Sequence, residues 1–138
     1  MIGPLPRPLR LIIADDNADM RWVVRTALQP EFTDVVEAAD GRQLFWHLLR
    51  ASMASPDGPS TNLVIIADVC MPTYSGLEVL DAWQDERAPV PVIVITSFPD
   101  DAVRAKVAAL GAILLPKPFT RAALRRVVDD ATRAMRSS

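Results

Sequence analysis

The 138-residue sequence contains a single cysteine and carries a formal net charge of only −2. One cysteine cannot form an internal disulfide, which favours a reducing compartment and hence the cytoplasm. The weak net charge gives no general attraction to nucleic acid or to an anionic membrane. No apolar run approaches the ~20 residues of a membrane span, and the proline-rich start lacks the apolar core of a signal peptide. We therefore expect neither a membrane protein nor direct binding to nucleic acid.

Half of the residues are hydrophobic and 23% are charged, which is typical of one globular domain with a full core. Short apolar runs alternate with segments of helical periodicity. We predict a lead-in over 1–8, a domain over 9–135 and a tail over 136–138. A Ser-, Pro- and Gly-rich segment, 51–61, predicts a surface loop.

Strands and helices are expected in strict alternation, five of each. The predicted strands are 9–14, 34–38, 63–68, 92–96 and 112–115. The predicted helices are 18–28, 43–53, 77–85, 99–110 and 120–135. This order predicts an α/β fold, a single doubly wound (βα)5 domain whose parallel sheet has helices on both faces.

Asp68 ends the most apolar of the predicted strands. The run Leu63–Ile66 has no polar break, as in a strand that is buried on both faces of a parallel sheet. Pro72 cannot continue a strand, so the chain must leave the sheet before it. Asp68 is therefore expected at the carboxyl edge of the sheet, where open α/β sheets bind their ligands.

Polar residues follow four of the five predicted strands: Asp15 and Asp16, Asp68, Thr96, and Lys117. A parallel sheet brings these strand ends to one edge. Crowded carboxylates need a positive partner, and Mg²⁺ suits a site of one or two carboxylates plus phosphate oxygens. Lys117 adds a point charge with three donors. An aspartate can act as a nucleophile toward phosphorus, so the pattern predicts a phosphoryl group on Asp68.

Each of these residues also has a purely structural interpretation. Asp15, Asp16 and Asn17 could only cap the next helix, Thr96 could only form a turn, and Lys117 could be a solvated loop charge. Their joint occurrence at the right ends of four strands favours the functional interpretation.

Other chemically notable residues are interpreted as structural. Cys70 is expected to be a small, partly buried residue rather than a reactive thiol. His47 lies on a helical stripe and is expected at the margin of the core. Trp22, Trp46 and Trp83 fall on predicted helices and are expected to be packing groups rather than a base-stacking platform.

From Leu9 to about Ala134 the chain resembles the receiver domain of two-component response regulators, the chemotaxis-regulator-like family. The resemblance implies a flavodoxin-like strand order of 2-1-3-4-5. The matching residues are the acidic pair Asp15-Asp16, the acceptor Asp68 before Met71-Pro72, the turn Gly76-Leu77-Glu78, the hydroxyl of Thr96, and Lys117-Pro118-Phe119.

The resemblance implies a role for each site residue. Asp16, Asp68 and the main-chain carbonyl of Cys70 would bind Mg²⁺, and Asp15 would act through water. Thr96 and Lys117 would hold the phosphoryl oxygens, and the peptide bond after Lys117 would be cis. A histidine kinase or a histidine phosphotransfer protein would donate the phosphoryl group, and a downstream protein would bind the switched face. The chain would be no enzyme beyond its own phosphorylation and dephosphorylation.

The sequence departs from the family at several positions. Leu114 stands where the family often has a tyrosine or phenylalanine, which puts an aromatic switch in doubt. Cys70 and Phe98 occupy positions that tune the lifetime of the phosphoryl group in the family, and Phe98 could shield it from water. The length leaves no room for an output domain, so we expect a stand-alone regulator, a phosphorelay shuttle or a receiver excised from a longer protein.

Receivers often dimerise through the face of the fourth helix, fifth strand and fifth helix. Four basic residues could serve such a homodimer or could be plain solvated charges: Arg104, Lys106, Arg121 and Arg125.

Two other functions compete with the switch. A phosphatase of the haloacid-dehalogenase type also uses Mg²⁺ and a strand-end aspartate, but it needs a second aspartate where this chain has Cys70. A flavodoxin-like flavin or nucleotide binder needs a glycine-rich first loop, whereas here Asp15 and Asp16 would repel phosphate in the absence of a metal.

Overall fold

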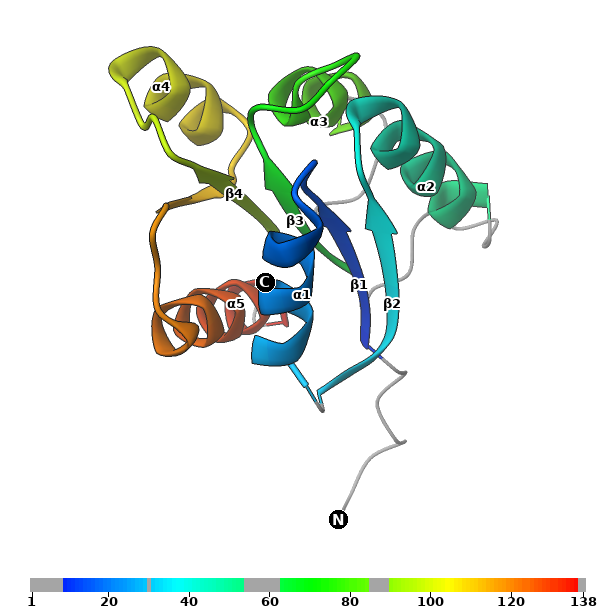
Figure 1. The fold of residues 1–138 in the computed structure, drawn as a ribbon, viewed down its shortest axis with the longest axis vertical. Coiled ribbons are helices and arrows are strands. Elements are labelled where there is room, and N and C mark those ends of the chain that lie inside the picture. Colours follow the sequence, from blue (N-terminus) through cyan, green and yellow to red (C-terminus); the bar gives the residue numbers. More distant parts are fainter. Residues whose placement is uncertain (1–8, 30, 54–62, 85–89, 137–138) are drawn as a thin grey trace.

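The structure is a computed structural model that describes residues 9–29, 31–53, 63–84 and 90–136. Within them, strands and helices alternate as the sequence predicts (Figure 1). The strands are β1 (Leu9–Ala14), β2 (Phe32–Ala38), β3 (Leu63–Asp68), β4 (Val92–Thr96) and β5 (Ile113–Pro116). The helices are α1 (Ala18–Ala27), α2 (Gly41–Met53), α3 (Gly76–Gln84), α4 (Asp101–Ala109) and α5 (Arg121–Arg136).

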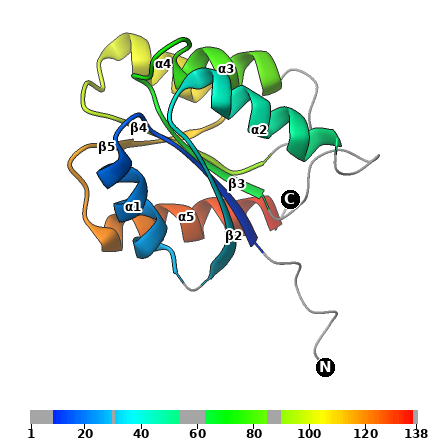
Figure 2. The same cartoon turned by 45° about the vertical axis from the view of Figure 1, so that its right-hand side comes forward.

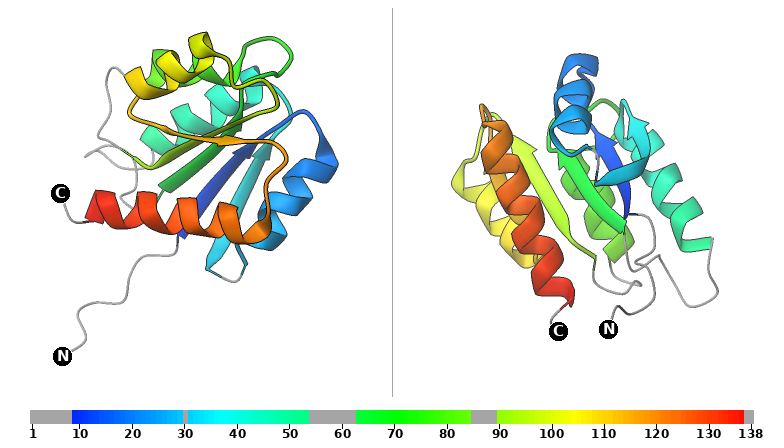
Figure 3. Two further views of the ribbon diagram at one scale, coloured as in Figure 1. Left: turned by 90° about the vertical axis from the view of Figure 1, so that its left-hand side faces the viewer. Right: turned by 90° about the horizontal axis from the view of Figure 1, so that it is seen from below.

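All neighbouring strands are parallel, in the order β2-β1-β3-β4-β5. The predicted doubly wound sheet and its flavodoxin-like order are thus confirmed. Helices α1 and α5 cover one face of the sheet, and α2, α3 and α4 cover the other (Figures 2 and 3). Side chains alternate between the two resulting cores, so that Ile13 and Ile66 face α1 and α5 while Ile12 and Ile65 face the other layer. All six residues of β3 are buried, which explains its unbroken apolar run.

Local sequence accounts for the helix ends. Asn17 caps α1 by accepting hydrogen bonds from the amides of Asp19 and Met20. Asp100 caps α4, and Gly111 ends it with a φ of +69°. Asp40 accepts a hydrogen bond from the amide of Gln43, and α2 consequently begins at Gly41, two residues before its predicted start.

The prediction for the tryptophans is right for one and wrong for two. Trp83 is 5% exposed, and its indole N–H donates to Ser52 Oγ at 3.0 Å. Trp22 and Trp46 are 59% and 60% exposed. Each lies two residues from an inward residue of its helix, Val24 or Leu48, and a helix turns about 200° over two residues, so the ring points outward.

Other boundaries differ by one or two residues. Strand β2 begins at Phe32 rather than at Asp34, and α3 begins at Gly76. Helix α2 ends at Met53 as predicted, so residues 51–53 are helical and the predicted loop starts too early. The predicted lead-in, the rest of that loop and the last two residues of the predicted tail lie outside the described residues. No helix in the described part of the chain combines the length and apolar character that a bilayer crossing requires.

Candidate functional site

The strand register brings the predicted site residues to one edge of the sheet. Asp15 directly follows β1, whose last residue pairs with Ala67 of β3. Asp68 ends β3 opposite Ile95, and Thr96, the next residue of β4, pairs with Pro116 just before Lys117. The residues that the sequence predicted to converge therefore do so at the carboxyl edge.

Three carboxylates form the acidic part of this site. Asp15, Asp16 and Asp68 each offer an oxygen, and these oxygens lie within 4.8 Å of one another. Asp15 and Asp68 are buried, whereas Asp16 is exposed. Carboxylate oxygens clustered in this way are suitable ligands for a hard divalent cation, so these residues fit such an ion, and Asp16 leaves the site open to solvent.

Lys117 bridges the two buried carboxylates. Its Nζ donates to Asp15 Oδ2 and to Asp68 Oδ2, both at 3.0 Å. Its main-chain amide donates to the carbonyl oxygen of Thr96 at 2.8 Å. The Lys117–Pro118 peptide bond is cis, as the resemblance implied. The lysine is therefore not a solvated loop charge, since it joins β1, β3 and β4 at the site.

Burial and charge shift the protonation of this pair. Burial raises the pKa of the Asp68 carboxyl, and the charge of Asp15 raises it further, against an opposing effect of Lys117. Burial opposes the charge of the Lys117 ammonium, but hydrogen bonds and charges from Asp15 and Asp68 outweigh it and raise the lysine pKa. One ammonium only partly neutralises the carboxylates, so further positive charge is favoured here.

The remaining polar atoms around Asp68 come from the loops. Its Oδ1 accepts a hydrogen bond from the amide of Cys70 at 3.2 Å, and Cys70 is exposed rather than partly buried as predicted. The buried hydroxyl of Thr96 accepts from the amide of Phe98 at 3.0 Å, which leaves its own proton available to another acceptor. Phe98 is 73% exposed, so its ring does not cover the site in this structure.

An arginine that the sequence analysis missed supports the acidic pair. Arg21 of α1 donates to the main-chain carbonyl of Asp15 at 2.7 Å and to Glu37 Oε1 of β2 at 2.8 Å. Arg25 pairs with the same glutamate. Helical periodicity says only that an arginine is off the apolar stripe, and the sequence carries no mark of a partner on another strand.

His47 lies where the sequence places it, at the margin of the core. It is half-buried, and its Nε2 lies 3.0 Å from the carbonyl oxygen of Glu37. Burial lowers the pKa of the imidazole, and the charges of Arg50 and Arg10 lower it further. The ring is thus a structural group and lies outside the acidic site.

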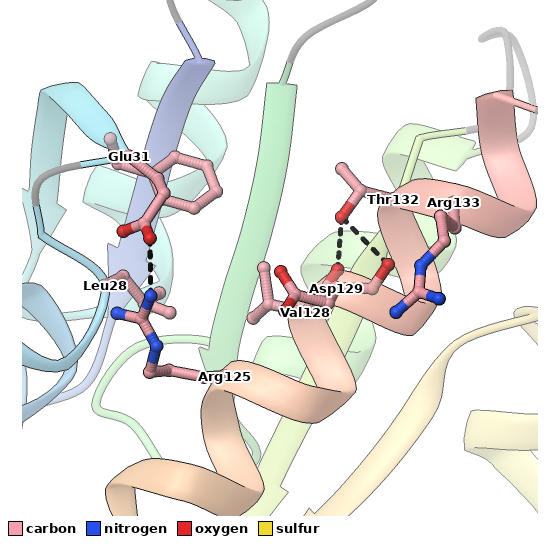
Figure 4. Close-up of a pocket in the computed structure, with 8 residues that line it drawn as sticks. Leu28, Glu31, Arg125, Val128, Asp129, Thr132 and Arg133 are labelled. Atoms are coloured by element: carbon pink, nitrogen blue, oxygen red, sulfur yellow. Dashed lines mark hydrogen bonds and ion pairs between the residues drawn. The ribbon is translucent and has the colours of Figure 1, made fainter.

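Two of the basic residues suggested for a dimer face are engaged elsewhere. Arg125 donates to the carbonyl of Ala27 at 2.7 Å and pairs with Glu31, and Arg121 reaches Thr26 Oγ1 of α1 at 3.4 Å. Arg125 and Glu31 border a groove of about 350 Å³ between α5 and the α1–β2 turn (Figure 4). This groove lies at the amino-terminal edge of the sheet, opposite the acidic cluster.

Comparisons with known proteins agree with this geometry. The family model described as the response regulator receiver domain matches residues 11–129. Response regulator MprA of Mycolicibacterium vanbaalenii is 31% identical over 134 residues, which is 89% of this chain and 53% of the relative. The probable transcriptional regulatory protein TcrX of Mycobacterium tuberculosis is 30% identical, over 87% of this chain and 51% of its own.

Solved structures show the same fold. The N-terminal domain of an uncharacterized protein from Wolinella succinogenes is 30% identical, with a TM-score of 0.75 over 95% of this chain and 98% of that chain. A CheY-like receiver domain protein from Methanospirillum hungatei has a TM-score of 0.80 at 17% identity, covering 95% of this chain and 98% of its own. The chain spans about half the length of the curated relatives named above. It belongs to the response regulator receiver family, whose general function is to accept a phosphoryl group in two-component signalling.

Proposed function

We propose that Asp68 is the phosphoryl acceptor of this chain. The observation that carries the proposal is the lysine bridge, in which the Nζ of Lys117 lies 3.0 Å from Oδ2 of both Asp68 and Asp15. The proposed chemistry is transfer of a phosphoryl group to this carboxylate. A carboxylate oxygen of Asp68 forms a bond to phosphorus, and the bond from phosphorus to the donor's imidazole nitrogen breaks, leaving its electron pair on the imidazole.

The acidic cluster would hold Mg²⁺ during the transfer. Asp16, Asp68 and the main-chain carbonyl of Cys70 are the proposed ligands, with Asp15 acting through water. When bound, the ion supplies positive charge for the phosphoryl oxygens. The amide of Cys70 already donates to Asp68 Oδ1. Cys70 therefore lies next to the carboxylate with which its carbonyl would share the ion.

Thr96 and Lys117 would convert the new charge into a change of shape. The Thr96 hydroxyl can turn its free proton toward a phosphoryl oxygen, and the Lys117 ammonium can leave Asp15 for the new dianion. Because Thr96 is followed at once by the β4–α4 loop, its movement would shift the start of α4. A partner protein would then bind the altered face.

The proposal also covers the phosphoryl donor and the protein that responds to the switch. The donor would be a histidine kinase or a histidine phosphotransfer protein, and the cytoplasm the location. Chains similar to this one form part of a C4-dicarboxylate transport transcriptional regulatory protein, of the sensor histidine kinase TmoS and of protein-glutamate methylesterases. This variety fits a switch unit whose effect depends on its partner. A homodimer would use the face of α4, β5 and α5, with Arg104 and Lys106 of α4 as its basic residues.

Intact-mass measurement tests the proposed function directly. Incubation with acetyl phosphate and Mg²⁺ should add one phosphoryl mass, located at Asp68, and excess chelator should prevent the gain, because the crowded carboxylates then repel the incoming phosphate. The control is p-nitrophenyl phosphate, which the chain should not turn over. Steady turnover would instead support a phosphatase, and labelling unaffected by chelator would contradict the metal assignment.

Phe98 is predicted to set the lifetime of the phosphoryl group. A Phe98→Ala variant should lose phosphate severalfold faster, because the proposed movement of Thr96 would draw the β4–α4 loop, and with it the Phe98 ring, over the acyl phosphate and away from its exposed position in this structure. The ring is 73% exposed, so its removal should leave the fold unchanged. The measurement is the decay of the phosphorylated mass after the donor is removed, with Trp22→Ala, an exposed aromatic residue of α1, as the control. An unchanged decay rate would rule out the shielding role.

A further inference from the structure

The β3–α3 loop, residues 69–75, joins Asp68 to α3; its start is hydrogen-bonded to the sheet and its end closes back on that start. At its start, the amide of Val69 donates to the carbonyl of Ile95 at 3.1 Å. At its end, the amide of Gly76 donates back to the carbonyl of Val69 at 3.1 Å. The loop also carries Cys70, the proposed main-chain metal ligand, so its placement decides where that carbonyl lies.

The middle of the loop is bound to the start of α2. The amide of Gly41 donates to the carbonyl of Pro72 at 3.2 Å, and the amide of Arg42 donates to Thr73 Oγ1 at 3.2 Å. First-turn amides of a helix lack partners within the helix, and here the loop supplies them. Thr73 has a φ of +68°, which is strained for a β-branched residue and persists only where its surroundings hold it.

Gly41 makes this contact possible because it has no side chain. A Cβ at position 41 would lie 2.1 Å from the carbonyl oxygen of Tyr74 and 2.7 Å from its Cβ. The nearest atom belongs to the backbone, so no side-chain rotation could relieve the clash. Capping does not account for a glycine here, since the side chain of Asp40 already accepts the amide of Gln43 at the start of this helix.

We propose that Gly41 is a positioning residue for the metal and phosphoryl site: by seating the β3–α3 loop on the start of α2, it fixes the Cys70 carbonyl relative to Asp68. The proposal rests on the proposed function, because it takes that carbonyl to be a metal ligand. It adds a requirement from a different element, since neither Gly41 nor any other residue of α2 belongs to the acidic cluster.

A second glycine makes a comparable close approach but cannot serve as the test. A Cβ at Gly76 would lie 2.3 Å from the carbonyl oxygen of Asp68. A substitution there would move the acceptor itself, so a loss of function would say nothing about the loop. Gly41 contacts the loop at Pro72 and Tyr74, away from the acceptor, and is therefore the informative position.

The test compares Gly41→Ala with Gln43→Ala. Gln43 Oε1 accepts the amide of Ala39 at 2.7 Å, so its loss weakens the start of α2 without touching the loop. Calorimetric titration with Mg²⁺ should give a Kd raised about tenfold or more by Gly41→Ala, as for residues that orient metal ligands. Gln43→Ala should leave the Kd unchanged. Saturating Mg²⁺ should restore most of the labelling rate with acetyl phosphate in Gly41→Ala, since the fault lies in affinity.

A measurement on the unmodified chain covers the case in which Gly41→Ala fails to fold. Hydrogen exchange at the amides of Gly41 and Arg42 should slow when Mg²⁺ saturates the site, while exchange at Gly111, at the end of α4, should not change. A folded Gly41→Ala variant with the Mg²⁺ affinity of the unmodified chain, or exchange at Gly41 and Arg42 that ignores Mg²⁺, would overturn the positioning role alone. An unmodified chain that binds no Mg²⁺ would overturn the proposed metal site and this role with it.

Discussion

Asp68→Asn will gain no phosphoryl mass under conditions in which the unmodified chain is fully labelled. An amide is a poor nucleophile toward phosphorus and carries no charge for a divalent ion. The change keeps the shape of the side chain, so the variant should retain the fold. The measurement is intact mass after incubation with acetyl phosphate and Mg²⁺.

Asp129→Asn is the matched control, because this exposed aspartate of α5 borders the groove at the opposite edge of the sheet. It should be labelled like the unmodified chain. Phosphoryl mass retained by Asp68→Asn would refute the acceptor assignment, and mapping of that mass to Asp15 or Asp16 would identify the true acceptor.

The same variant should be more stable than the unmodified chain at neutral pH. Burial raises the pKa of the Asp68 carboxyl, so the ionised carboxylate is less favourable in the folded state than in the unfolded state at neutral pH. The neutral amide removes that cost, so the Tm should rise by a few degrees. The advantage should shrink as the pH falls through the raised pKa of Asp68, since the native carboxyl is then neutral too. Thermal unfolding across this range measures it.

Lys117→Ala should destabilise the chain and disconnect phosphorylation from the change of shape. It removes the ammonium shared by two buried carboxylates, whose side chains are 1% and 7% exposed. Leaving buried charges unpaired costs about 3 kcal/mol. The raised pKa of Lys117 means that its contribution is fully present at neutral pH and is lost only as the pH rises through that pKa. Because the variant leaves Asp15 and Asp68 without their ammonium partner, added Mg²⁺ should stabilise it more than it stabilises the unmodified chain.

Two readouts separate these effects. Denaturant unfolding at neutral pH measures the stability, and near-ultraviolet circular dichroism before and after labelling measures the change of shape. Lys106→Ala is the control, because Lys106 is the chain's only other lysine and is exposed on α4. A labelled Lys117→Ala variant with the full spectral change would show that the lysine has no part in the switch.

Much of the fold could be predicted because the deciding interactions are local or periodic. The unbroken run before Asp68 predicts a strand buried on both faces, and β3 is buried throughout. The polar residues after the strands could be placed together because a parallel sheet aligns its carboxyl ends. Asn17, one of the residues expected to cap the first helix, does so.

The features that escaped prediction depend on contacts between distant segments. The sequence predicts a helix that starts at residue 43, whereas Gly41 is the first residue of α2 and touches a loop some thirty residues later in the chain. Arg21 could not be linked to Asp15 and Glu37 from its own helix alone. Residue type predicts packing for Trp22 and Trp46, whereas their positions relative to the apolar stripe of each helix predict the exposure that is observed. The one sequence cue to the loop contact is a glycine that directly follows the capping Asp40, at a position where the cap itself does not require glycine.

The hydrogen bond from the Lys117 amide to the Thr96 carbonyl has a mechanical consequence. The ammonium and the hydroxyl proposed to grip a phosphoryl group belong to residues whose backbones are tied together at 2.8 Å. A displacement of either residue should therefore move the other through this hydrogen bond, and no rotating aromatic side chain is required. This chain has Leu114 in place of an aromatic residue. The hydrogen bond would let phosphorylation of Asp68 shift the end of β4 without one.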